Sequence, residues 1–156
     1  MPLALLFCLA LVVLSTIIHY EMLRGLTALL PRWTWAARTQ LIGVILGAFV
    51  AHAAEIVLYA AALFLMSGVF GLGTLGVQEK LSFTVALYFS AETFTSLGYG
   101  DVVPSGSLRL IAGVVALNGL LLIGWTASYT YLAMERLWTD RVPGGRGRAT
   151  SAGPTE

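Results

Sequence analysis

The chain has 156 residues, of which 58% are hydrophobic and only 11% are charged, and its formal net charge is +1. So few charges cannot cover the surface of a water-soluble globule of this size, and the high hydrophobicity excludes a disordered chain. The small net charge gives no reason to expect nucleic acid as a partner. The composition therefore predicts a membrane protein whose main surroundings are lipid.

Three long segments are nearly free of charge. Residues 3–20 and 110–134 carry no charged side chain, and residues 39–78 carry only Glu55. A helix needs roughly 20 apolar residues to cross the hydrocarbon core. We therefore predict spanning helices at about 3–23, 40–66 and 107–136.

Arginines indicate how these helices are oriented. Three of them lie within residues 24–39 and four follow residue 135. Because basic residues gather on the cytoplasmic side, both segments are expected inside, with the N-terminus outside and the C-terminus in the cytoplasm. Residues 1–39 then form an extra N-terminal helix and a cytoplasmic loop. The Pro-, Gly- and Ser-rich tail 139–156 is predicted to be disordered.

The segment between the second and third predicted spans contains a short apolar stretch. Residues 81–94 (LSFTVALYFSAETF) can form a helix of roughly 20 Å, which is too short to span. The Gly-rich sequence TSLGYGDVVPSG follows. Irregular backbone at membrane depth must be buried in protein or line a water-filled cavity. We therefore predict a re-entrant loop.

The glycines of this loop suggest a chemistry. Gly98 and Gly100 stand at alternate positions and permit dihedrals that other residues avoid. Successive backbone carbonyls can then point to one side and replace the water shell of a cation, aided by the negative end of the preceding helix dipole. One chain supplies one such row, so a complete ring around an ion requires several chains related by cyclic symmetry.

The sequence ETFTSLGYGDVVP resembles the pore signature of potassium channels, whose selectivity filter reads T-V-G-Y-G-D. The similarity extends from about Leu81 to Trp138, and the whole chain is similar to small bacterial three-helix members of the ion-channel superfamily. The resemblance implies an all-α membrane protein with three transmembrane helices, assembled as a homotetramer in the bacterial inner membrane. It implies a pore domain over 40–138, with outer helix 40–66, pore helix 81–94, filter 95–101 and inner helix 107–136.

The implied function is passive conduction of K⁺ through a selectivity filter. The resemblance implies no enzyme activity, no cofactor, no metal beyond the permeant K⁺ and no other small-molecule substrate. A weakly selective cation channel and a non-conducting regulatory subunit remain alternatives. The ion-binding residues that the resemblance implies are Thr95, Ser96, Leu97, Gly98, Tyr99 and Gly100.

Two filter positions depart from the family. Ser96 stands where Thr is usual and Leu97 where Val is usual. Serine keeps the hydroxyl oxygen of the innermost site but lacks the methyl group that packs behind it. We predict a looser inner site with selectivity retained.

Two acids flank the filter. Glu92 ends the pore helix and Asp101 follows the filter, and in some relatives the matching acids share a proton. The resemblance thus implies a pH-sensitive support of the filter; the alternative is two separately solvated acids. Tyr88 can donate a hydrogen bond to Asp101, whereas Phe89 has no polar atom with which to brace Tyr99.

Polar residues also lie within the predicted spans. His52 and Glu55 share one face of the second helix, and Asn118 lies at a similar depth on the third. Either a polar clamp between helices or a proton-sensing pair fits this pattern. A metal site is not expected, because the chain holds one H-x-x-E motif and His19 belongs to another helix.

The third predicted helix contains a candidate hinge. Gly119 lies within one residue of the hinge glycine of the family, counted from Pro104, and the alternative role is close helix packing. Asn118 is also a candidate for facing the central cavity and offering an oxygen to a hydrated ion.

Overall fold

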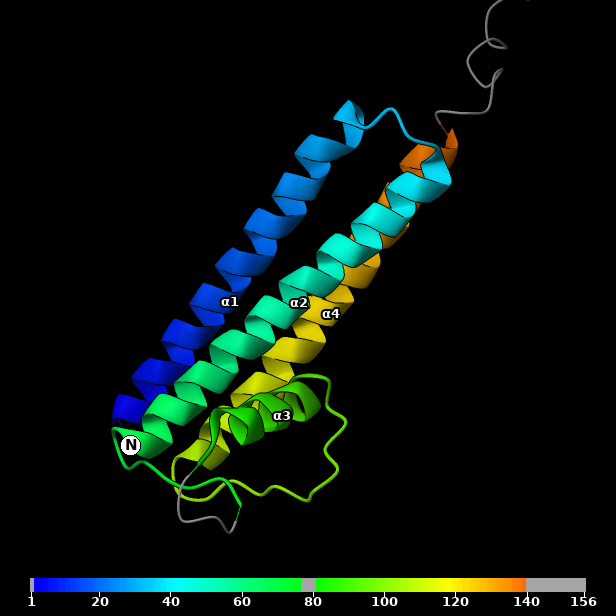
Figure 1. Ribbon diagram of the computed structural model, residues 1–156. Coiled ribbons are helices and arrows are strands. Elements are labelled where there is room, and N and C mark those ends of the chain that lie inside the picture. Colours follow the sequence, from blue (N-terminus) through cyan, green and yellow to red (C-terminus); the bar gives the residue numbers. More distant parts are fainter. Residues whose placement is uncertain (1, 77–80, 140–156) are drawn as a thin grey trace, which may run out of the picture.

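The computed structural model describes residues 2–76 and 81–139 (Figure 1). Within this part of the chain, every regular element is helical. Three of the helices are long and apolar enough to cross a membrane, which confirms an all-α, multi-pass membrane protein. The elements in order are α1 (Pro2–Leu29), the 3-10 helix η1 (Leu30–Arg32), α2 (Ala37–Gly68), α3 (Phe83–Phe94) and α4 (Leu108–Thr139).

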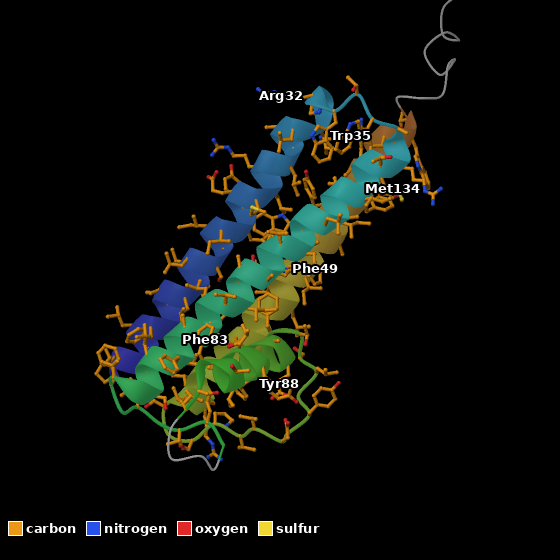
Figure 2. All side chains as sticks on the ribbon, viewed as in Figure 1. Arg32, Trp35, Phe49, Phe83, Tyr88 and Met134 are labelled. Atoms are coloured by element: carbon orange, nitrogen blue, oxygen red, sulfur yellow. The ribbon has the colours of Figure 1, made fainter. Side chains whose placement is uncertain are left out.

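The long helices α1, α2 and α4 run side by side, and α3 packs against α2 and α4 near one end of the bundle (Figure 1). The N-terminal end of α1 lies at that same end. The α1–α2 connection and the C-terminal end of α4 lie together at the opposite end, where Figure 2 places Arg32 and Met134. Within the described residues, the two segments that carry arginines therefore lie at the same end of the bundle.

The first helix is longer than predicted. Residues 24–29 were expected in a loop, but they continue α1, and only residues 33–36 separate η1 from α2. Arg24 is consequently helical and forms an exposed ion pair with Glu21 at 2.9 Å, the i, i+3 spacing that a helix favours. The α-helix ends at Leu29, and the chain continues directly into the 3-10 helix η1, whose first turn contains Pro31.

The short helix α3 begins two residues later than predicted. Ser82 caps it, with its hydroxyl accepting a hydrogen bond from the Val85 backbone N–H at 3.2 Å. Its 12 residues are too few to span a membrane. Most of the predicted disordered tail, residues 140–156, lies outside the described residues.

Large apolar side chains cover the outside of the bundle. Phe49, for example, is 72% exposed and projects from α2 (Figure 2). An exterior of this kind suits lipid tails or neighbouring protein rather than water.

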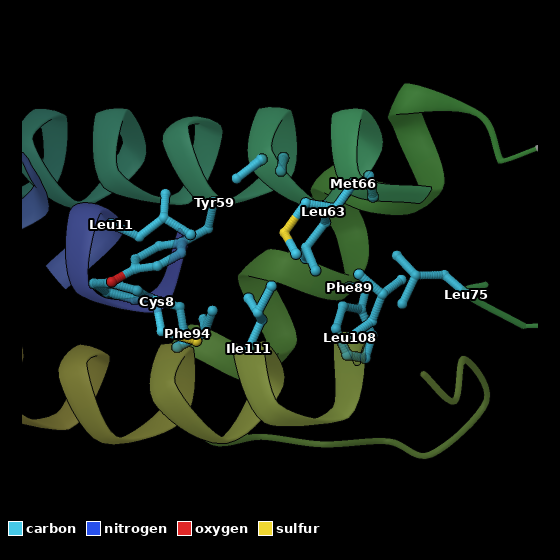
Figure 3. Packing of buried hydrophobic residues seen from close by; sticks show 14 of the residues in the cluster. Cys8, Leu11, Tyr59, Leu63, Met66, Leu75, Phe89, Phe94, Leu108 and Ile111 are labelled. Atoms are coloured by element: carbon cyan, nitrogen blue, oxygen red, sulfur yellow. The ribbon is translucent and has the colours of Figure 1, made fainter. Parts of the chain in front are cut away.

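The apolar core lies where α3 meets the three long helices (Figure 3). Phe94 at the end of α3 is 1% exposed and packs beside the Tyr59 ring. Cys8, the single cysteine, is buried in the same core as a free thiol. Other members of this cluster are Leu11, Leu63, Met66, Leu75, Phe89, Leu108 and Ile111.

The segments before α3 and after residue 101 are joined to each other. Leu75 and Pro104 form an isolated antiparallel bridge, and the Ser105 hydroxyl accepts a hydrogen bond from the Thr74 backbone N–H at 2.9 Å. The Ser105 backbone N–H in turn donates to the Thr74 carbonyl at 2.9 Å. These contacts fix the backbone on both sides of α3 and thereby position the loop that follows it.

Candidate functional site

The loop that follows α3 has an alternating backbone. Ser96, Gly98 and Gly100 have φ angles of 59°, 57° and 79°, and the residues between them have none in this range. Glycine adopts such angles readily. Ser96 is the one non-glycine residue with positive φ in the described part of the chain, so the loop is locally strained there.

Three successive amides of this loop point towards Glu92. The Leu97 and Gly98 backbone N–H groups donate to the Glu92 carbonyl at 2.8 and 3.3 Å. The Tyr99 N–H donates to the Glu92 carboxylate at 3.2 Å. In a trans peptide the C=O points opposite to the N–H. The carbonyls of the same three peptide units, contributed by Ser96 to Gly98, therefore point away from α3.

Glu92 and Asp101 do not share a hydrogen bond in the described structure, contrary to the expectation of a proton shared between them. The side chain of Glu92 is turned inwards to the Tyr99 amide and the residue is 4% exposed. Asp101 instead accepts a hydrogen bond from the Tyr88 hydroxyl at 3.0 Å, the contact that the sequence predicted. Each acid thus has its own hydrogen-bond partner.

Desolvation of the phenol and its hydrogen bond to Asp101 raise the pKa of Tyr88 to about 12. Both causes favour the neutral phenol. Desolvation disfavours the charged phenolate, and an ionised Tyr88 would also face the carboxylate of Asp101. Tyr88 therefore remains a donor to Asp101 throughout the physiological range.

Thr95 is oriented differently from the rest of the loop. Its hydroxyl donates to the Ala91 carbonyl at 2.9 Å, in the last turn of α3. The hydroxyl is thus engaged within the helix end. In contrast, Leu97 and Tyr99 are 58% and 69% exposed, so their side chains lack packing partners within one chain.

The end of α3 is pressed against α4 at Gly119. A Cβ atom at this position would overlap the Phe94 carbonyl, with its carbon only 2.8 Å away. Of the two roles considered for Gly119, the structure provides direct evidence for close packing, which seats the end of α3, and thus the start of the loop, on α4.

Asn118 faces α1 and α2. Its amide donates to the Ser15 hydroxyl at 2.7 Å and to the Tyr59 hydroxyl at 2.8 Å, and the residue is 5% exposed. Asn118 thus joins three helices through Ser15 and Tyr59 rather than through His52 or Glu55, and the alternative in which Asn118 faces a cavity is wrong.

His52 and Glu55 do pair, but with an unexpected third member. Glu55 Oε2 lies 2.9 Å from His52 Nδ1, and Glu55 Oε1 lies 2.8 Å from Nδ1 of His19 on α1. His19 belongs to α1, and the packing of α1 against α2 brings it to Glu55. One nitrogen or oxygen atom of each of these three side chains lies within 4.8 Å of the other two, so His19 is close to the H-x-x-E pair although it belongs to another helix.

Comparison with known proteins identifies the family of the chain. The profile of a family described as "Ion channel" matches residues 41–136, from α2 through the loop to α4. The match covers more than half of the chain, and the chain belongs to this ion channel family. The resemblance to potassium channel pore domains is confirmed by the same comparisons.

Two curated relatives are both described as potassium channels. The calcium-gated potassium channel TvoK of Thermoplasma volcanium is 40% identical over 48 residues, which is 30% of this chain and 14% of the relative. Two-pore potassium channel 4 of Arabidopsis thaliana is 34% identical over 79 residues, which is 47% of this chain and 28% of the relative. The chain therefore matches less than a third of the length of either relative. No solved structure gives a significant match.

Proposed function

We propose that the protein is a K⁺-selective channel that conducts K⁺ passively through the loop 95–101. The observation that carries this proposal is the set of three successive amides turned towards Glu92. A row of carbonyls on the opposite side offers oxygen ligands that can replace the hydration shell of K⁺. The names of the two relatives support K⁺ as the permeant ion.

A complete pore requires more than one chain. One chain offers a single row of carbonyls, and closed cyclic symmetry would place several such rows around one axis. The exposure of Leu97 and Tyr99 fits a loop that gains neighbours on assembly. We propose a homotetramer in which α4 lines the inner cavity and α2 and α1 lie outside it.

We also propose the orientation expected from the arginines. Arg32, Arg38 and Arg136 lie at or near the end of the bundle opposite α3. With that end in the cytoplasm of a bacterial inner membrane, the loop opens towards the outside.

Flux into liposomes tests the function. The purified full chain should support K⁺ uptake with little Na⁺ uptake. Gly98→Ala should abolish the K⁺ flux, because Gly98 has a φ of 57° that alanine adopts only at a cost. Gly25→Ala is the matched control, since a Cβ there meets no atom within 4 Å and the residue is helical. Equal flux from the two variants would contradict the assignment of the loop.

A further inference from the structure

Four polar side chains close a ring of hydrogen bonds inside the bundle. Beyond the two contacts of Glu55 with His19 and His52, the Thr126 hydroxyl on α4 lies 3.3 Å from His19 Nε2 and 3.0 Å from His52 Nε2. Both nitrogens of both imidazoles are thus engaged. We call this set, His19, His52, Glu55 and Thr126, the His–Glu–Thr ring. It joins α1, α2 and α4.

The surroundings of the ring are apolar. The side chains of His19 and Glu55 are fully buried, and that of His52 is 18% exposed. The centroid of the Trp125 ring on α4 lies 5.1 Å from that of the His19 ring. The centroid of the Phe94 ring on α3 lies 5.6 Å from that of the His52 ring. An unbalanced charge at this place would therefore be costly.

A neighbouring polar layer is uncharged. One turn away from Glu55 on α2, Tyr59 is a further titratable group on this face. Its hydroxyl is held by Ser15 from α1 and Asn118 from α4. This layer joins the same three helices without a carboxylate or an imidazole, so it offers a control for the ring.

The number of hydrogens in the ring follows from its contacts. Four contacts each require one hydrogen, whereas two neutral imidazoles and the Thr126 hydroxyl supply three. With three hydrogens, Glu55 is an uncompensated carboxylate and one contact brings two lone pairs together. A fourth proton fills that contact and makes the ring neutral, wherever along the ring it resides. Burial favours this four-proton state, because it leaves neither a net charge nor an unmade hydrogen bond.

We propose that the His–Glu–Thr ring is a proton-binding site that holds α1 against α4, and that loss of its fourth proton at alkaline pH loosens α1 from α4. Its effect on conduction rests on the proposed function, in which α4 lines the cavity. The ring is also one side chain away from the filter loop. Phe94 packs beside His52 of α2 and against Gly119 of α4, and it directly precedes Thr95.

Replacement of Glu55 by glutamine provides a specific test. The new side-chain amide could accept from one Nδ1–H and donate to the other Nδ1, so it would supply the fourth hydrogen permanently while the ring stays neutral. Glu55→Gln should therefore keep the ring closed at every pH. Thr126→Val preserves the side-chain shape but removes the hydroxyl, and it should open the ring at every pH. Ser15→Ala alters only the uncharged layer and should retain the pH response of the wild type.

The distance between α1 and α4 is the direct readout. Spin labels at Leu29 and Trp138, both exposed, would be introduced in full chains carrying Cys8→Ser, diluted with unlabelled chains in lipid nanodiscs. The distance is compared at about pH 6 and about pH 9, which bracket the ordinary titration of histidine. We expect it to lengthen or broaden with pH in the wild type and in Ser15→Ala, but to stay short in Glu55→Gln. A distance that is independent of pH in the wild type, or a Glu55→Gln variant that responds as the wild type does, would overturn the proposal.

Two further measurements separate the alternatives. If a chelator lengthens the distance at about pH 6 and Zn²⁺ restores it, the ring binds a metal ion and the proton proposal is overturned. In liposomes, we expect K⁺ flux to change roughly fivefold or more across this pH range in the wild type and to stay constant in Glu55→Gln. A pH-dependent distance without K⁺ flux would support the ring and contradict the proposed channel function. K⁺ flux together with a distance that does not change with pH would support the channel function and contradict the ring proposal.

Discussion

The Glu92 carboxylate accepts a hydrogen bond from the Tyr99 backbone N–H at 3.2 Å, seven residues further along the chain. This contact joins the last turn of α3 to the middle of the loop 95–101. It complements the two bonds that the Glu92 carbonyl accepts from Leu97 and Gly98, so one residue holds three successive amides. The orientation of the loop backbone therefore depends on a single side chain and the helix end that carries it.

Substitution of Glu92 should separate hydrogen bonding from charge. Glu92→Ala leaves the partly buried Tyr99 N–H without its acceptor, and an amide left unpaired in this way costs at most about 1–3 kcal/mol, the value for a fully buried group. We expect lower thermal stability and a loss of discrimination between K⁺ and Na⁺ in liposome flux. Glu92→Gln can still accept from the same N–H and should stay close to the wild type. If Glu92→Gln loses stability and selectivity as much as Glu92→Ala does, the charge of Glu92 rather than its hydrogen bond is what matters.

Gly119 should tolerate no side chain. Gly119→Ala places a methyl group against the Phe94 carbonyl, and overpacking of this kind typically costs about 1–3 kcal/mol. The measurement is thermal unfolding in detergent. Gly113→Ala on the same helix is the control, since a Cβ there has no atom within 4 Å and should leave the melting temperature unchanged or higher. A neutral effect of Gly119→Ala would show that α3 does not press on α4 as described.

Tyr88 should ionise only at high pH. The raised pKa of about 12, against 10.0 for a free phenol, means that the folded chain holds this proton more tightly than the unfolded chain. Its contribution to stability is therefore complete below about pH 10 and is lost as the pH rises towards 12. The difference in tyrosine absorbance between wild type and Tyr88→Phe during an alkaline titration measures it. Asp101→Asn should lower the midpoint, and an unaltered midpoint would mean that Asp101 is not the cause.

Ser96 should show opposite effects on stability and ion binding. Its φ of 59° is strained for a residue with a Cβ, by about 1–2 kcal/mol, and glycine relieves that strain. Ser96→Gly should therefore raise thermal stability while it weakens K⁺ binding through loss of the hydroxyl. Ser96→Ala removes the hydroxyl but keeps the Cβ, so it should weaken K⁺ binding without stabilising the chain. Isothermal titration with K⁺ and thermal unfolding test the pair, and unchanged K⁺ affinity in both would exclude the hydroxyl from the innermost site.

The fold could be predicted largely from where charges are missing. Uncharged stretches located the three long helices, and the length of residues 81–94 distinguished α3 from a spanning helix. The ends were less predictable. Arg24 suggested a loop, yet an exposed Glu21 partner lets it remain in α1.

The contacts between the helices could not be predicted, because all three are apolar on every side. Outward-facing residues such as Phe49 are as apolar as the core, so hydrophobic periodicity does not reveal the buried face. A signal for the His19–Glu55 contact was nevertheless present. Within an antiparallel helix pair, His19 and Glu55 lie equally far on either side of residue 37, as Ser15 and Tyr59 do. A turn placed near residue 37, instead of the centre of 24–39, would have brought both pairs together.

The reversal potential under bi-ionic conditions tests the central claim most directly. The purified full chain is reconstituted in a planar bilayer with K⁺ on one side and Na⁺ on the other. A carbonyl-lined filter at 95–101 predicts a reversal potential far from zero, with the sign expected when K⁺ is much more permeant than Na⁺, and Gly98→Ala should remove the current. A clear current that reverses near zero, and that persists in Gly98→Ala, would contradict the account.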